Sequence, residues 1–293
     1  MRRCRTTRLR SKTERQLVRM ALRDRDEDRR WRAVAELHRR ACPQTVAVAQ
    51  ELTRSANWRR RVLGLDIAAQ LRRGQPDGES VGAPYALLCA QGLLLAGLED
   101  AHLQVQAAAL AGLGHRPLAD ALPRLLDFAE HPSAELRWHL TVTLDSYPQP
   151  ASISALLRLA QDADARVRDW ATFGLGSLHD ADTPAIRDLL ARNLGDPDSN
   201  VRAEAVAGLV RRGDPRAAEY LLTHLNDDSG TLDFRMAEQL AEPALLPALR
   251  ALVADADGPD VNPDWRDALQ AALAACDTGA ARGQDSAEGG IAG

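Results

Sequence analysis

The sequence predicts an all-α protein in which about eight helical pairs stack into a right-handed α-solenoid. The first observation is an apolar stripe at i, i+4 and i+8, a spacing that puts three side chains on one face of a helix. The stripe occurs at Val105/Ala109/Leu113, Leu136/Leu140/Leu144, Val167/Ala171/Leu175 and Val201/Ala205/Leu209. The second observation is a period, because the first residues of successive stripes are 31, 31 and 34 positions apart. No stretch alternates with the period of two that a half-buried strand requires.

The clearest repeat unit lies at residues 162–178. Asp162 and Asp164 are suited to cap the start of its helix, because their side-chain oxygens accept unpaired N–H groups of the first turn. Gly174 and Gly176 would let a neighbouring backbone approach closely. The same criteria predict helices around Leu17–Leu22 and from Pro43, and at Arg29–Arg40, Arg60–Leu71, Tyr85–Leu98, Leu103–Leu113, Leu118–Glu130, Ser133–Ser146, Ile153–Ala160, Asp164–Leu178, Thr183–Leu194, Ser199–Arg212, Pro215–Leu225, Thr231–Leu240, Leu245–Val253 and Pro263–Ala275.

The predicted solenoid occupies residues 12–276. Residues 1–11 are rich in arginine and residues 277–293 are small and polar, so both are expected to be disordered tails. Residues 74–83 (GQPDGESVGA) form a Gly- and Pro-rich loop insertion. The chain contains no run of 18 apolar residues, which excludes a membrane span. Four cysteines without a CxxC pair indicate reduced thiols and a cytoplasmic protein.

The charge of −4 hides a strong asymmetry along the chain. Residues 1–73 hold 21 Arg and Lys against 8 Asp and Glu, whereas residues 74–293 hold 16 against 33. Such a basic end predicts either an anionic partner or merely solvated helix faces. The candidate anion-binding residues are Arg30, Arg32, Arg59, Arg60 and Arg61. Nucleic-acid binding through them is expected only at low salt, as a consequence of charge.

The repeated pattern D-x-D-x-x-VR-x-x-A-x-x-x-LG, followed by a Pro-led LLxLL helix, resembles a HEAT repeat. The resemblance covers roughly residues 100–275. Within the family, these repeats are most similar to the bacterial repeats grouped with phycobilisome lyases. It implies that the arginine after the first (anchor) position of each stripe pairs with a turn aspartate of the neighbouring repeat. These arginines are Arg30, Arg61, Arg137, Arg168, Arg202 and Arg266, and the aspartates are Asp100, Asp162, Asp196 and Asp228.

Motifs that would carry chemistry are missing from the sequence. The seven histidines form no HxxxH or HExxH spacing, and no His-Glu dipeptide of the kind that holds iron in deoxyhypusine hydroxylase occurs. The sequence also lacks a GxSxG and a Walker A motif. No cofactor and no metal are therefore predicted. An enzyme or enzyme accessory similar to bilin lyases or to HEAT-like DNA glycosylases remains the alternative to a binding protein.

The predicted function is a non-enzymatic scaffold that binds a protein or peptide on its concave face, lined by the second helix of each pair. Helical register places Trp138, Val142 and Phe173 away from the core stripe, with Asp145 and Asp169 pointing the same way. An apolar centre with an acidic rim suits a peptide that carries one apolar anchor flanked by Arg or Lys. The alternative is that these side chains pack against a shifted neighbouring helix. Trp170 is expected to flank the core and Trp265 to lie within it.

Overall fold

The computed structural model describes residues 9–72, 83–226, 228–253 and 262–288. All its named elements are helices, and an isolated bridge between Arg72 and Pro84 is the one extended pairing among these residues. Internal contacts divide the chain into two compact units, Met1–Ala155 and Leu156–Gly293. The first unit contains α2 (Glu14–Arg23), α3 (Glu27–Arg40), α4 (Pro43–Thr53), α5 (Trp58–Ala69), α6 (Leu87–Gly97), α7 (Leu103–His115), η1 (Ala119–Ala121), α8 (Leu122–Leu126), η2 (Asp127–Glu130) and α9 (Ala134–Leu144).

The unit boundary falls inside α10 (Pro150–Leu159). The second unit continues with α11 (Ala165–Phe173), η3 (Gly174–Leu178), α12 (Pro184–Asn193), α13 (Ser199–Arg211), α14 (Pro215–His224), α15 (Thr231–Leu240), η4 (Pro243–Leu245), α16 (Leu246–Val253) and α17 (Pro263–Glu288). The predicted all-α solenoid of helical pairs is therefore confirmed.

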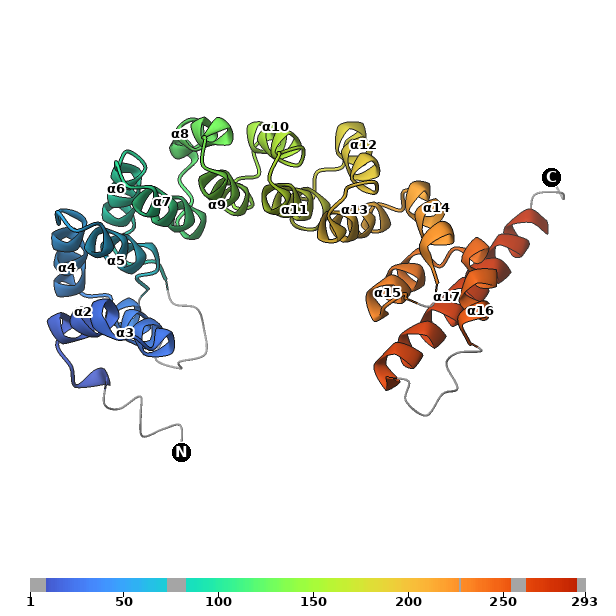
Figure 1. The fold of residues 1–293 in the computed structure, drawn as a ribbon, viewed down its shortest axis with the longest axis horizontal. Helices are drawn as coiled ribbons and strands as arrows, with labels where there is room; N and C mark the ends of the chain where they lie inside the picture. The colour runs from blue at the N-terminus through green and yellow to red at the C-terminus, as the bar shows by residue number, and fades with distance from the viewer. Residues whose placement is uncertain (1–8, 73–82, 227, 254–261, 289–293) are drawn as a thin grey trace. The chain divides into compact units, whose positions relative to one another are not determined.

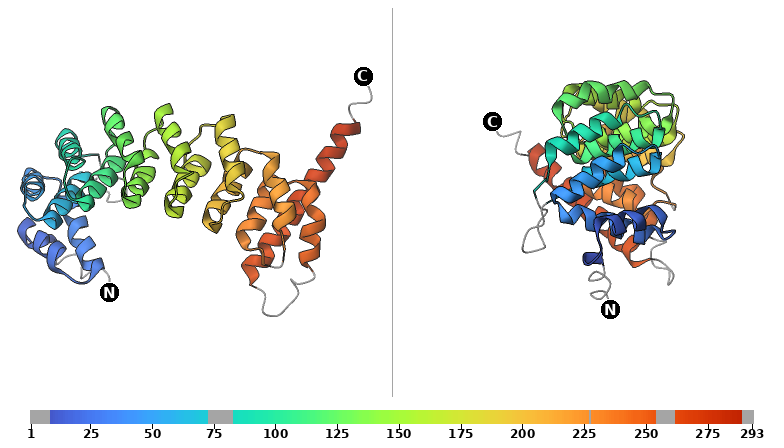
Figure 2. Two further views of the ribbon diagram at one scale, coloured as in Figure 1. Left: turned by 45° about the horizontal axis from the view of Figure 1, so that its top comes forward. Right: turned by 90° about the vertical axis from the view of Figure 1, so that its left-hand side faces the viewer.

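Each unit consists of two layers of helices (Figure 1). In the first unit α4, α6 and α8 form one layer and α5, α7 and α9 the other, and in the second unit α12 and α14 lie over α11, α13 and α15. The second helices of successive pairs contact one another, as α5 with α7 and α11 with α13. The left view of Figure 2 shows the pairs within each unit side by side. The surface formed by the second helices is therefore the continuous one within each unit.

Capping residues explain where many of the helices begin. Asp164 accepts from the backbone N–H groups of Arg166 and Val167, and Asp198 caps α13 in the same way. Thr13 forms a capping box with Gln16 at the start of α2. Thr183 caps α12, and the proline that follows it loses no hydrogen bond at the first helical position.

The predicted stripes form the core. All twelve residues of the four stripes are buried, with at most 2% of any residue exposed. The predicted role of Gly176 is also confirmed, because a methyl group added there would lie 3.2 Å from the Cα of Gly208 on α13. Backbones of η3 and α13 therefore meet at a pair of glycines.

Three elements differ from the sequence prediction in conformation or in register. The helix predicted at Leu118–Glu130 is broken into η1, α8 and η2, with Pro123 at the start of the α-helical turn. The end of the helix predicted at Asp164–Leu178 is a π-turn, in which the N–H of His179 donates to the carbonyl of Gly174 at 2.9 Å. In α15 the spacing of Leu232, Met236 and Leu240 predicts one buried stripe, and Met236 is buried as expected, but Leu232 is 56% exposed and Phe234 is buried instead. The larger ring of Phe234 contacts Trp265 edge to face, which favours its burial over that of Leu232.

The last helix, α17, continues to Glu288, beyond the end predicted at Ala275, so the segment 277–293 begins inside a helix. Most of the predicted N-terminal tail and the loop insertion at 74–83 lie outside the described residues. Trp265 itself is partly buried rather than fully enclosed, and its indole N–H donates to the carbonyl of Ser229 at 2.8 Å.

Candidate partner-binding surfaces

Arg61 on α5 links two repeats in the first unit. Arg61 donates from Nε and Nη2 to the two carboxylate oxygens of Asp100, at 2.7 and 2.8 Å. Its Nη1 donates to the carbonyls of Ser55 and Ala56 in its own turn. A bidentate pair of this kind fixes orientation as well as distance. The role that the HEAT resemblance implies for Arg61 is confirmed.

The second unit repeats the arrangement with Arg168 and Asp196. Nε and Nη2 of Arg168 donate to the carboxylate at 2.7 and 2.8 Å, and Nη1 donates to the carbonyls of Asp162 and Ala163. The hydrogen bond from Arg168 lowers the pKa of Asp196. Arg202 donates to the carbonyls of Asp196 and Pro197. These arginines stabilise turns between helices.

In the first unit, α9 carries three of the predicted partner-binding residues. Trp138 and Val142 are half-buried, and the Trp138 ring meets His139 edge-on with 4.6 Å between ring centres. Asp145 follows the helix as its C-cap and is also half-buried. Burial raises the pKa of the Asp145 carboxyl to about 7. Neither apolar side chain is fully buried, and their role in binding stays a prediction.

In the second unit, α11 carries the other two predicted partner-binding residues, Asp169 and Phe173. It also carries Trp170, which the sequence analysis expected to flank the core. Trp170 is half-buried like Phe173, and the two rings meet edge to face with 5.7 Å between their centres. Trp170 therefore belongs to the same partly exposed aromatic surface. Two half-buried aromatic rings in contact present a firm apolar surface with few rotatable bonds.

A second carboxylate accompanies Asp169 on the neighbouring helix α13. Burial raises the pKa of Glu204, and the negative charge of Asp169 raises it further. The pKa of Asp169 is raised by burial and by the charge of Asp198. Sequence reasoning missed Glu204, although it lies three positions after Val201, as Trp170 lies three positions after Val167. The α11–α13 surface thus joins two aromatic rings to mutually repelling carboxylates.

The α9 residues and the α11 residues belong to different units. Their combination into one apolar cluster, with Trp138, Val142 and Phe173 at its centre, stays a prediction.

The five arginines predicted to bind anions fall into two groups. Three are engaged within the protein: Arg30 Nε donates to the carbonyl of Ala21, Arg32 lies 3.4 Å from the Asp28 carboxylate, and Arg61 holds Asp100. The other two, Arg59 and Arg60, line a groove of about 570 Å³ in the first unit.

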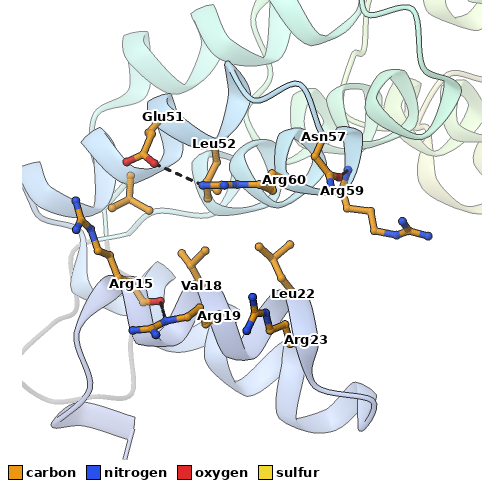
Figure 3. Close-up of a pocket in the computed structure, with 11 residues that line it drawn as sticks. Arg15, Val18, Arg19, Leu22, Arg23, Glu51, Leu52, Asn57, Arg59 and Arg60 are labelled. Atoms are coloured by element: carbon orange, nitrogen blue, oxygen red, sulfur yellow. Dashed lines mark hydrogen bonds and ion pairs between the residues drawn. The ribbon is translucent and has the colours of Figure 1, made fainter.

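The groove lies between α2 and the α4–α5 pair (Figure 3). Sequence reasoning missed three arginines on its α2 side, Arg15, Arg19 and Arg23. Their four-residue spacing places them on one helical face and was the available signal. Among the described residues, no group of three or more His, Cys, Asp and Glu side chains is placed to hold a metal ion. None of the described helices combines the length and apolar character needed to cross a bilayer.

The stacked pairs and the arginine–aspartate links define a solenoid of helical repeats. A family model described as HEAT repeats matches residues 92–176 and 158–241, which together span just over half of the chain. The chain therefore belongs to the HEAT-repeat family.

One relative is protein YibA of Escherichia coli strain K12, which is 33% identical over 104 residues. That match covers 35% of this chain and only 37% of YibA. An X-ray structure of the E. coli YibA protein superposes with a TM-score of 0.72 at 22% identity, over 92% of this chain and 94% of that chain. A structure of Kap95p with RanGDP aligns with a TM-score of 0.59 at 14% identity, over 89% of this chain and 40% of that chain. These likenesses show the HEAT/armadillo-type fold and do not confirm the narrower phycobilisome-lyase grouping.

Proposed function

We propose that the protein is a binding scaffold that holds a protein or peptide partner on the surface formed by its second helices. The observation that carries the proposal is the half-buried aromatic pair Trp170 and Phe173 on α11, which lies beside the carboxylates Asp169 and Glu204. Aromatic side chains at a surface contribute large contact area at low conformational cost, which is why they dominate binding hot spots.

The first unit offers a surface of similar chemistry on α9. Trp138 and Val142 supply apolar area, and Asp145 supplies a carboxyl group whose pKa is raised to about 7 by burial. A cation placed beside that carboxyl would favour its charged form. The partner that suits both surfaces is a segment with an apolar anchor flanked by Arg or Lys.

Partner binding would also favour ionisation of the carboxylates on α11 and α13. Burial raises the pKa of both carboxyl groups, and a neighbouring negative charge raises each further: that of Asp198 acts on Asp169, and that of Asp169 acts on Glu204. An arginine or lysine of the partner removes the repulsion, so charge complementarity supplies selectivity beyond the aromatic contact.

Selection of displayed random peptides against the full chain tests the proposal. We expect enrichment of sequences with one aromatic or large aliphatic residue flanked by Arg or Lys. Phe173→Ala should weaken the binding of the selected peptides by about 2 kcal/mol or more, because a central aromatic contact is lost. The matched control is Leu222→Ala, which removes an exposed apolar side chain from α14, in the other helical layer. The Leu222→Ala variant should bind the selected peptides with the same affinity as the wild type.

Two results would contradict the proposal. One is that no peptide is enriched above a column without protein. The other is that the enriched peptides bind Phe173→Ala, Trp138→Ala and the wild-type chain with equal affinity. Both variants are first checked for an unchanged helical circular dichroism spectrum.

A further inference from the structure

The groove between α2 and the α4–α5 pair combines an apolar floor with a basic rim. Its apolar lining consists of Val18, Leu22, Val48 and Leu52. The rim carries Arg15, Arg19 and Arg23 from α2 and Arg59 and Arg60 from α5, with Glu51 as the only acidic lining residue. Figure 3 shows Arg19 and Arg23 below Val18 and Leu22, Arg15 to the left of them, and Arg60 reaching towards Glu51 above.

Four of these arginines have no carboxylate partner within the described part of the chain. Arg60 lies 3.5 Å from Glu51, whereas Arg19 Nε donates only to the carbonyl of Arg15, at 3.4 Å. Arg59 stands over the Trp58 ring, 4.6 Å from its centre. Elsewhere in the same unit, Arg40 pairs with Glu14 and Glu36, and Arg61 pairs with Asp100. The groove therefore brings together four arginines that have no carboxylate partner among the described residues.

The spacing of the α2 arginines has an energetic cost in the free protein. Like charges four positions apart on a helix repel one another and destabilise it modestly. Arg15, Arg19 and Arg23 form two such pairs in succession, each separated by about 6 Å along the helix axis. An anionic ligand with charges at a similar spacing would remove this repulsion and gain ion pairs.

We propose that this groove binds an acidic amphipathic helix of a partner protein. Asp or Glu side chains at four-residue spacing meet Arg15, Arg19 and Arg23, and aliphatic side chains between them enter the space above Val18 and Leu22. Helix-in-groove recognition uses this combination of apolar anchors and flanking charge. The surface is distinct from the α9 and α11 surfaces, and the proposal stands independently of them.

The lining favours an acidic peptide over a single-stranded nucleic acid. Stacking of bases on aromatic side chains supplies much of the affinity of single-strand binders. None of the residues that line this groove is aromatic, and its floor consists of branched aliphatic side chains. Aliphatic side chains of a peptide would bury apolar area against this floor, which a phosphate backbone would not.

The test uses the full chain and a fluorescein-labelled 15-residue helical peptide with Glu at three positions four residues apart and Leu between them. We expect saturable binding by fluorescence anisotropy that weakens steeply as salt rises. Arg15→Gln/Arg19→Gln should weaken binding about tenfold, because two exposed ion pairs are lost while helix propensity is kept. The matched control is Arg192→Gln, since Arg192 is exposed on α12 of the second unit. It should leave the affinity unchanged.

The apolar floor is tested separately from the charge. A peptide in which Ser replaces Leu keeps every charge, and it should bind at least tenfold more weakly than the original peptide if the floor contributes. The proposal is overturned if that peptide binds equally well, or if the double Arg variant binds like the wild type. It is also overturned if a 15-nucleotide thymidine oligomer binds more tightly than the Leu/Glu peptide, or if self-association of the chain displaces the peptide.

Discussion

Arg168 and Asp196 join neighbouring repeats through two parallel hydrogen bonds of 2.7 and 2.8 Å. The arginine lies on α11 and the aspartate in the turn before α13. Asp196 also accepts from the backbone N–H of Asp198 at 2.9 Å, so the same carboxylate organises its own turn. Both side chains are largely withdrawn from solvent. The pair therefore fixes the turn and the spacing of two repeats together.

Replacing Arg168 with Ala should lower the free energy of unfolding by about 2 kcal/mol, because charged hydrogen bonds are lost and Asp196 loses its counter-ion. Denaturant unfolding measures the change. A double-mutant cycle with Asp196→Asn should show that the two substitutions are less than additive. Arg192→Ala provides the control for loss of an exposed arginine and should change stability little. Additive effects in the cycle would mean that the pair contributes no coupling energy.

The core of the repeats could be predicted from the sequence because helical periodicity alone determines it. Val167, Ala171 and Leu175 are buried as the four-residue spacing requires. The Arg61–Asp100 link was predictable as well, since the HEAT resemblance assigns partners to those positions. Features that recur in each repeat can be predicted without knowing how the repeats are placed relative to one another.

Other features depend on contacts that a single repeat does not specify. The α-helical pattern through Gly174 gave no sign of a π-turn, which accompanies the close approach of η3 to α13. Arg212 on the neighbouring repeat donates to the carbonyls of Leu175 and Gly176 there. The basic groove was also missed, because Arg19 and Arg59 come from helices whose facing surfaces are fixed by packing between pairs.

Alanine substitution should have opposite effects at Gly208, which contacts Gly176, and at Gly92, which has open space around it. A methyl group at Gly208 would lie 2.8 Å from the Cα of Gly176 and 2.9 Å from Leu190. Gly208→Ala should therefore destabilise the protein by about 1–3 kcal/mol, because a backbone must move. A methyl group at Gly92, in the exposed face of α6, would meet no atom within 4 Å. Gly92→Ala should instead stabilise it by roughly 0.5–1 kcal/mol through helix propensity.

Thermal or urea unfolding of the two variants checks this contrast. Both substitutions add the same methyl group within a helix, so each serves as the control for the other. Equal changes in stability would show that η3 and α13 do not approach as closely as the structure has them.

The raised pKa of Asp145 predicts how stability varies with pH. Burial raises the pKa of this carboxyl from 3.8 to about 7 in the folded chain. Well below pH 3.8 the group is protonated in both states, and its contribution to stability is fully present. As pH rises, the unfolded chain loses the proton first, so the contribution declines and is lost as pH passes through about 7.

Asp145→Asn should remove this pH-dependent component. The measurement is the free energy of unfolding in urea from pH 4 to pH 8 for the variant and the wild type. The difference between the two should change most between pH 4 and 7 and then level off. Asp66→Asn gives a second, narrower window, because burial raises the pKa of Asp66 to about 6. A difference that does not vary with pH would contradict the assignment.

Leu175 and Leu178 lie in the same π-turn, and truncating them should have very different effects on stability. Leu175 is fully buried at the contact with α13, whereas Leu178 is 47% exposed. Leu175→Ala should cost about 2–5 kcal/mol, since it removes apolar contacts and leaves a cavity. Leu178→Ala deletes the same atoms from an exposed position and should change stability by less than about 0.5 kcal/mol.

Because each repeat is stabilised by its neighbours, the Leu175→Ala effect should be greatest in α11, α12 and α13. Hydrogen exchange should accelerate there before it does in α2 and α3, and uniform acceleration along the chain would argue against nearest-neighbour coupling.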